Sequence, residues 1–147
     1  MTRRAVLTIL LSGLGALGIA GCSGARSKAF ALEEGLERWS RNRPRAYRYE
    51  ISLLGFLPAN RYRVEVKAGA TRGTVTVIEG PDIFLDTSAW DSIDGLFATA
   101  LRVVSSGGKA SIEFAPDGFV PKLVRTDPLP GAIDDEVDYK VSAFEAL

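Results

Sequence analysis

Acidic side chains gather near the C-terminal end of the chain and are the first candidates for chemistry. Asp134, Asp135, Glu136 and Asp138 lie close together, and Asp127 precedes them. Carboxylate oxygens are the ligands that Ca²⁺ prefers, and a pair of carboxylates can transfer protons to and from a substrate. The stretch lacks the Asp-x-Asp-x-Asp-Gly spacing of a dedicated calcium loop. We therefore expect a solvated loop whose aspartates cap turns; the alternative is a carboxylate- or metal-dependent enzyme that uses this acidic loop.

A run of arginines is the second candidate. It consists of Arg38, Arg41, Arg43, Arg45 and Arg48, and Arg61 and Arg63 could join it from the next strand; Arg41, Arg43, Arg45 and Arg48 are the four candidate site residues. Guanidinium groups close to an anionic lipid or polymer surface contribute about 1 kcal/mol per charge. The alternative is a solvated face on which these arginines pair with neighbouring glutamates and contribute little to stability. The sequence favours the solvated face. We keep the four arginines, together with the first two aspartates of the acidic loop, as the candidate surface site, and we expect the arginines near the anchored end of the molecule.

Histidine is absent from the 147 residues, and cysteine occurs once, at Cys22. This excludes Ser-His-Asp and Cys-His nucleophile pairs, histidine-ligated zinc and histidine acid–base catalysis. A single cysteine also excludes an intramolecular disulfide. The sequence therefore predicts no catalytic residue, no cofactor and no metal.

The first 22 residues have the pattern of an export signal that ends at this cysteine. Arg3 and Arg4 precede an uncharged, mostly apolar run, residues 5–20, which as a helix would span roughly 24 Å. That is shorter than the ~30 Å hydrocarbon core of a bilayer, so the run is typical of a signal peptide. The sequence IAGC at residues 19–22 resembles the lipobox of bacterial lipoproteins, in which the cysteine thiol receives a diacylglycerol. The alternative is an ordinary secretory signal, but the single cysteine falls at the lipobox position.

The predicted domain organisation follows from this leader. Residues 1–21 form a lipoprotein signal peptide, residues 22–28 a tether, and residues 29–147 a single domain. The two arginines near the start also resemble the twin-arginine export pattern, with the general secretion route as the alternative. Cleavage leaves 16 basic against 18 acidic residues, so we expect no nucleic-acid partner.

Apolar periodicity predicts two helices. Leu32, Leu36 and Trp39 recur at helical spacing from Ala29 onwards, and Pro44 ends this helix. The second helix begins after Ser92, an N-cap residue, and its apolar residues recur as far as Val104.

Alternation of apolar and polar residues predicts six strands. Pro121 lies within the fifth predicted strand, which indicates that this strand is at an edge of the sheet or contains a bulge. The short connections require antiparallel pairing, so the expected fold is α+β. In it, one antiparallel sheet of about six strands carries two helices on one face, in the order helix, three strands, helix, three strands. The predicted strands cover residues 47–53, 61–67, 74–78, 109–114, 119–126 and 137–141.

Several short motifs are spread along most of the mature chain. In order, they are Trp39 with Tyr47-x-Tyr49, Gly118-Phe119-x-Pro121, and Asp134-Asp135-Glu136 followed by Tyr139. Together they resemble an uncharacterised family of bacterial lipoproteins and secreted proteins, of the domain-of-unknown-function kind. The resemblance implies export and the α+β fold and adds no activity. Many members of that family carry cysteines after the first strand. Residues 54–58 have none, so a role that rests on those thiols does not carry over.

The sequence thus predicts a bacterial cell-envelope protein that is exported and anchored to the cell membrane through a lipid on Cys22. Without a catalytic constellation, the domain is expected to be a non-enzymatic binding or assembly module. Its expected partners are the membrane, through the lipid, and an envelope protein or an anionic lipid or polymer.

Overall fold

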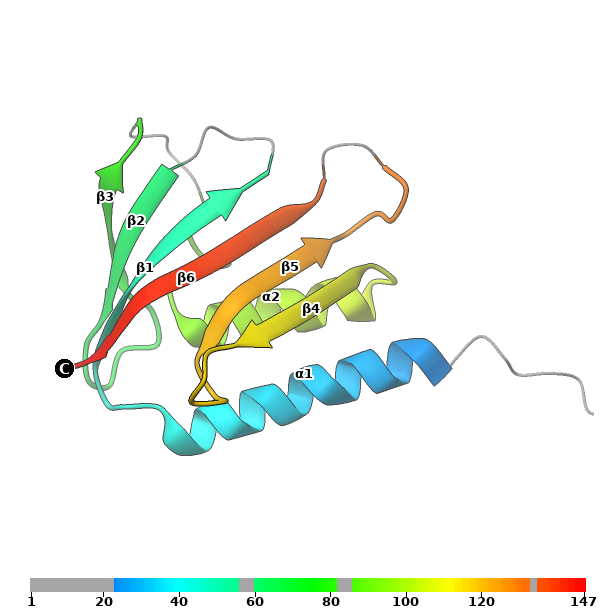
Figure 1. Ribbon diagram of the computed structural model, residues 1–147, viewed down its shortest axis with the longest axis horizontal. Coiled ribbons are helices and arrows are strands. Elements are labelled where there is room, and N and C mark those ends of the chain that lie inside the picture. The colour runs from blue at the N-terminus through cyan, green and yellow to red at the C-terminus, as the bar shows by residue number, and fades with distance from the viewer. Residues whose placement is uncertain (1–22, 56–59, 82–85, 133–134) are drawn as a thin grey trace, which may run out of the picture.

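A computed structural model describes residues 23–55, 60–81, 86–132 and 135–147. In this part of the chain six strands form one antiparallel sheet, and two helices lie on one face of it (Figure 1). The order of helices and strands is the predicted one, which confirms the α+β class. The bounds are α1 Ser23–Asn42, β1 Tyr47–Leu54, β2 Asn60–Val66, β3 Thr74–Glu79, α2 Ile93–Ser105, β4 Lys109–Phe114, β5 Pro121–Asp127 and β6 Val137–Ala146.

The sheet consists of two antiparallel meanders that meet at its centre. The strand order is β3-β2-β1-β6-β5-β4, so the first and the last strands of the chain are neighbours. Tyr47 at the start of β1 lies opposite Ala146 at the end of β6. The edges of the sheet are therefore β3 and β4.

The first helix is longer than predicted. It begins at Ser23, so residues 23–28, which the sequence assigned to a tether, are helical. Nothing in this small, polar segment breaks a helix, because it contains no proline and only one glycine. The end of the helix agrees with the prediction: the N–H of Arg43 donates to the carbonyl oxygen of Trp39 at 2.7 Å, and Pro44 follows.

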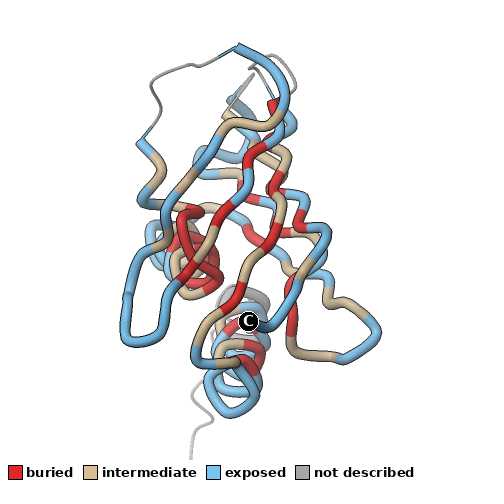
Figure 2. Tube along the Cα trace, turned by 90° about the vertical axis from the view of Figure 1, so that its left-hand side faces the viewer, coloured by how far each residue is buried: buried red, intermediate tan, exposed pale blue. Residues whose placement is uncertain are grey.

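The core is centred on Trp39, which has no exposed surface. Its ring packs edge-to-face on Tyr47 and on Phe144, with centroids 5.2 and 6.0 Å apart. These contacts fix the last turn of α1 on the two central strands. Figure 2 shows that buried residues gather where the sheet and the helices face one another.

A bulge in β6 brings Phe144 into this core. The register against β1 shifts between Arg48 and Glu50, and Ala143 has a φ of +48°. The extra residue lets Val141 and Phe144 face the same side of the sheet. The predicted strand stopped at residue 141 because strict alternation fails there, and β6 in fact runs to Ala146.

Two local predictions about caps and bulges are confirmed. The Ser92 hydroxyl accepts a hydrogen bond from the N–H of Gly95 at 3.0 Å, which caps α2. Pro121 lies at a register shift between β4 and β5, where Lys122 is the extra residue. The strand begins at Pro121 rather than at the predicted Phe119.

Gly35 lets α1 approach the rest of the domain closely. A Cβ atom at this position would lie 2.6 Å from Cζ of Phe114 on β4 and 3.2 Å from Cε1 of Phe97 on α2. The absence of a side chain at this one position therefore sets the distance between α1 and its two neighbours.

We predict that Gly35→Ala lowers the free energy of unfolding by about 1–2 kcal/mol, because the added methyl group overpacks this contact. An alanine in an exposed helix interior would instead stabilise by about 1 kcal/mol. Urea unfolding measures the difference, and Glu33→Ala on the exposed side of α1 is the control. The double variant Gly35→Ala with Phe114→Leu should recover part of the loss. An unchanged or higher stability of Gly35→Ala would contradict the prediction.

Candidate functional site

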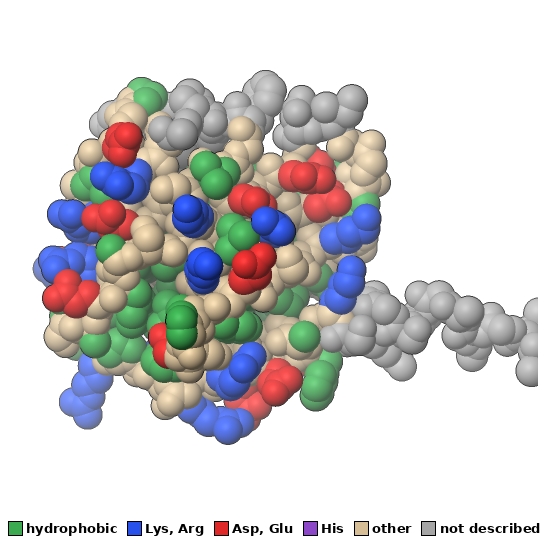
Figure 3. All heavy atoms as spheres, in the orientation of Figure 1, with side chains coloured by type: hydrophobic (Ala, Val, Ile, Leu, Met, Phe, Trp, Pro, Cys, Tyr) green, Lys and Arg blue, Asp and Glu red, His purple; other side chains and the backbone are tan. Residues whose placement is uncertain are grey.

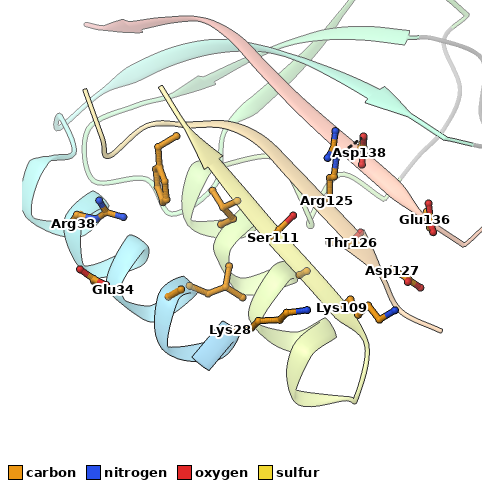
Figure 4. A pocket seen from close by; sticks show the side chains of 15 residues that line it. Lys28, Glu34, Arg38, Lys109, Ser111, Arg125, Thr126, Asp127, Glu136 and Asp138 are labelled. Atoms are coloured by element: carbon orange, nitrogen blue, oxygen red, sulfur yellow. Dashed lines mark hydrogen bonds and ion pairs between the residues drawn. The ribbon is translucent and has the colours of Figure 1, made fainter. Parts of the chain in front are cut away.

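A groove of about 540 Å³ lies between α1 and the edge strand β4. Its floor is apolar, formed by Leu32 of α1 and by Ala110, Ile112 and Phe114 of β4. Polar side chains from α1, β4, β5 and β6 surround the floor (Figure 4). We call this space the α1–β4 groove.

The groove exists because α1 touches β4 mainly at one end. Gly35 packs against Phe114, and the guanidinium carbon of Arg38 lies 4.7 Å from the centroid of the same ring, a cation–π contact. In the described sheet β4 has a strand neighbour, β5, on one side only. An edge strand of this kind presents backbone N–H and C=O groups that can pair with another strand.

Arg125 at the rim of the groove is held by two carboxylates. Nε of Arg125 lies 3.2 Å from Oδ2 of Asp138, and the two side chains point toward one another in Figure 4. Nη1 of Arg125 also lies 3.8 Å from Oε1 of Glu113. Figure 3 shows acidic and basic side chains interspersed on the face that it views. An apolar floor, paired charges and a free strand edge suit recognition of another chain.

A second hollow, of about 800 Å³, lies at the other end of α1 beside residues 68–71. Arg43, Tyr47 and Asp94 line it. Oδ1 of Asp94 lies 2.9 Å from Nη1 of Arg43, and Oδ2 accepts a hydrogen bond from Nε1 of Trp39 at 3.3 Å. Asp94 also lies in the first turn of α2, where the helix dipole favours a negative charge. The Asp94 carboxylate thus joins α1 to α2, and the Arg43 guanidinium is already ion-paired with it.

Two buried tyrosines lie beside this cluster. The hydroxyl of Tyr47 accepts a hydrogen bond from the N–H of Ile93 at 3.3 Å, and burial raises the pKa of Tyr47 to about 12. The hydroxyl of Tyr49 donates to the carbonyl oxygen of Trp90 at 2.6 Å, and burial raises the pKa of Tyr49 well above its usual value near 10. Both phenols therefore stay neutral at physiological pH and have structural roles.

The predicted arginine site is mostly paired. Arg41 pairs with Glu37 one turn earlier in α1, Arg43 pairs with Asp94, and Arg48 pairs with Glu145 across β1 and β6 at 2.5 Å. Arg45 lines the second hollow, and no carboxylate of the described residues lies within ion-pair distance of it. Only Arg41 pairs with a neighbouring glutamate, as the sequence predicted; Arg43 and Arg48 pair with carboxylates that are distant in sequence.

These arginines were predicted near the anchored end of the molecule, but Cys22, the predicted anchor, lies outside the described residues. Arg43 and Arg45 follow the C-terminal end of α1, and Ser23 begins the helix. A helix of 20 residues is about 30 Å long. The arginines and an anchor on Cys22 can reach the same membrane only when α1 lies along its surface.

The acidic loop behaves as predicted where it is described. Oδ2 of Asp135 accepts a hydrogen bond from the N–H of Leu129 at 2.7 Å, which is a turn-capping role. Asp138 points to Arg125 instead. Among the described residues no three histidine, cysteine, aspartate or glutamate side chains are grouped so that they could hold a metal ion. Asp134 and Cys22 lie outside the described residues.

Sequence reasoning missed the residues that define both hollows. Asp94 follows the predicted N-cap residue Ser92 closely, but its bonds to Trp39 and Arg43 span 55 and 51 residues along the chain. The alternation of polar residues in β4 was visible, but only the strand order shows that β4 is an edge. No signal in a single sequence gives either fact.

We predict that alkaline pH destabilises the domain through its buried tyrosines. Folding favours the neutral phenol of Tyr47. The contribution of this group to the free energy of unfolding is therefore fully present below pH ~10 and is lost as the pH rises through about 12. Tyrosinate absorbance and circular dichroism, followed together, measure this. Tyr47→Phe should show a smaller loss of stability over the same pH range. Ionisation of all four tyrosines near pH ~10 in a still-folded protein would contradict the prediction.

Within the described part of the chain, no helix is long and apolar enough to cross a membrane. No curated protein and no solved structure is significantly similar to this chain. A family model does match: the family of unknown function DUF6174 covers residues 31–146, from α1 to the end of β6. This agrees with the predicted resemblance to an uncharacterised family. The chain therefore belongs to DUF6174, a family of unknown function.

Proposed function

We propose that this protein is a bacterial cell-envelope lipoprotein whose α+β domain is a non-enzymatic binding or assembly module at the membrane surface. The observation that carries the proposal is the leader, in which a short apolar run ends in the sequence IAGC and the single cysteine of the chain. Helix α1 begins at Ser23, so the attachment residue directly precedes a helix that packs on the rest of the domain.

The chemistry of the domain surface supports binding rather than catalysis. The α1–β4 groove offers an apolar floor and a free strand edge. The carboxylates of the described surface, such as Asp94 and Asp138, hold arginines.

We predict that Cys22→Ser releases the protein from membranes, because the serine hydroxyl cannot form the thioether to diacylglycerol. Fractionation of cells that express either form measures the release, and Ser23→Ala is the matched control that should stay bound. Intact mass should show a mature chain that begins at Cys22 and carries lipid. A Cys22→Ser variant that stays in the membrane fraction after washing, or a wild-type N-terminus without lipid, would contradict the proposal.

A carboxylate- or metal-dependent enzyme is the second candidate, and one observation favours it. Among the described residues, Oδ1 of Asp127 and Oδ1 of Asp135 are buried and accept no hydrogen bond. Buried carboxylate oxygens without donors are the atoms that a cation can satisfy. These two aspartates belong to the acidic segment that the sequence singled out.

We predict that Ca²⁺ does not change the thermal midpoint of the protein, because the acidic loop caps turns. A ligand that binds only the folded state raises the free energy of unfolding, and therefore the thermal midpoint. The gain in free energy is about 2.7 kcal/mol when the ligand concentration is a hundred times its Kd. A rise that is lost in Asp135→Asn and kept in Asp117→Asn would support the metal site instead. Asp117 is the matched control because its Oδ1 likewise accepts backbone N–H groups, from Phe119 and Val120.

A further inference from the structure

The strand β4 is an edge that remains regular along most of its length. Its pairing with β5 continues without interruption from Lys109 to Glu113, and the extra residue at the register shift belongs to β5. Helix α1 lies beside the free side of β4, and the α1–β4 groove separates the two (Figure 4). A further strand added at this edge would extend the sheet.

The side chains of β4 are complementary to those of a second β4 in the antiparallel direction. Lys109, Ser111 and Glu113 are exposed on the outer face, and Ala110 and Ile112 face the helices. When two copies of β4 pair antiparallel about Ser111, each Lys109 lies opposite the Glu113 of the other copy. Opposite charges at directly paired positions stabilise two strands, and like charges there destabilise them.

The inner face is complementary in the same register. Ala110 of one copy lies opposite Ile112 of the other, so a small side chain meets a large one. Ala110 and Ile112 already belong to the apolar floor of the α1–β4 groove, whose volume of about 540 Å³ leaves space for the side chains of an added strand. A register displaced by one residue would put one of these apolar side chains opposite a charged residue and the other opposite Ser111.

We propose that β4 is a self-association surface and that its occupant is a second copy of this chain. The two β4 strands pair antiparallel about Ser111, which gives a two-fold dimer with one sheet continuous through both copies. This specifies the assembly role of the proposed function, and it does not depend on the lipid anchor. The charge complementarity of Lys109 and Glu113 is the reason for choosing a second copy over an unrelated peptide.

The other edge of the sheet does not offer the same surface. In β3 the register against β2 shifts between Arg61 and Tyr62, which leaves Ile78 as an extra residue. A bulge of this kind makes an edge strand less able to pair with a strand of another chain. The N–H of Gly73, directly before β3, already donates to the carbonyl oxygen of Asp91 at 2.8 Å. β3 also lacks a pair of opposite charges placed symmetrically along its length.

Ser111→Cys in the full chain tests the pairing directly. Ser111 lies on the two-fold axis, where the Cα atoms of opposed antiparallel residues are about 4.5–5.5 Å apart, within the ~4.4–6.8 Å that a disulfide spans. Mild oxidation of membranes that contain this variant should give a reducible dimer on a gel. Thr76→Cys, exposed on the β3 edge, is the matched control and should stay monomeric, as should the parent chain with Cys22 alone. A Ser111→Cys yield no higher than the control, or crosslinking mainly to a different protein, would overturn the proposal.

Charge exchange tests the register. In the Ser111→Cys background, Lys109→Glu alone and Glu113→Lys alone should each reduce the dimer yield by about tenfold, because like charges then face one another. The double variant with both changes should restore it. Equal yields in all four chains would overturn the register. Membrane fractionation of the same samples reports the anchor separately: dimers that form in the soluble fraction would contradict the lipid anchor and support the pairing.

Discussion

The structure depends above all on the burial of Trp39 at the end of α1. Its ring packs on Tyr47 and Phe144, which belong to the first and last strands, and its indole N–H binds Asp94 at the start of α2. One side chain therefore connects both helices with the centre of the sheet. Large aromatic side chains contribute strongly to a core because they bury a large apolar area while a polar atom still finds a partner. The bulge at Ala143 serves the same cluster, since it directs Phe144 toward Trp39.

Local sequence patterns were sufficient for the type and order of the helices and strands, because each depends on periodicity and on breakers close by. Ser92 and Pro121 were predicted correctly for the same reason, since caps and bulges are local. Contacts between distant segments were not predictable. Both β1 and β4 follow a helix, yet β1 is central and β4 is an edge, because β1 pairs with β6 at the far end of the chain. The partners of Arg43 and Arg48 lie 51 and 97 residues away in the sequence, so the arginine site was predicted as a run of charges and not as separate ion pairs.

The distribution of charge explains why the surface offers so few conventional sites. Cross-strand pairs such as Arg63 with Glu50 and Arg48 with Glu145 cover the outer face of the sheet. Each exposed pair contributes little to stability, and each arginine in such a pair is already held by a carboxylate. The α1–β4 groove differs because its free groups belong to the backbone and its floor is apolar. Recognition there depends on shape and strand pairing more than on net charge.

The start of α1 at Ser23 has a consequence for orientation. If Cys22 carries the lipid that we propose, a helix that begins at Ser23 leaves no flexible stalk, and the domain would stay within its own width of the bilayer. Figure 1 shows α1 and β4 running in the same direction. In the proposed dimer, two copies joined antiparallel through β4 would therefore have their Ser23 residues at opposite ends of the shared sheet. With the proposed lipid on each copy, such a pair would lie parallel to the membrane as a flat plate with one broad face directed away from it.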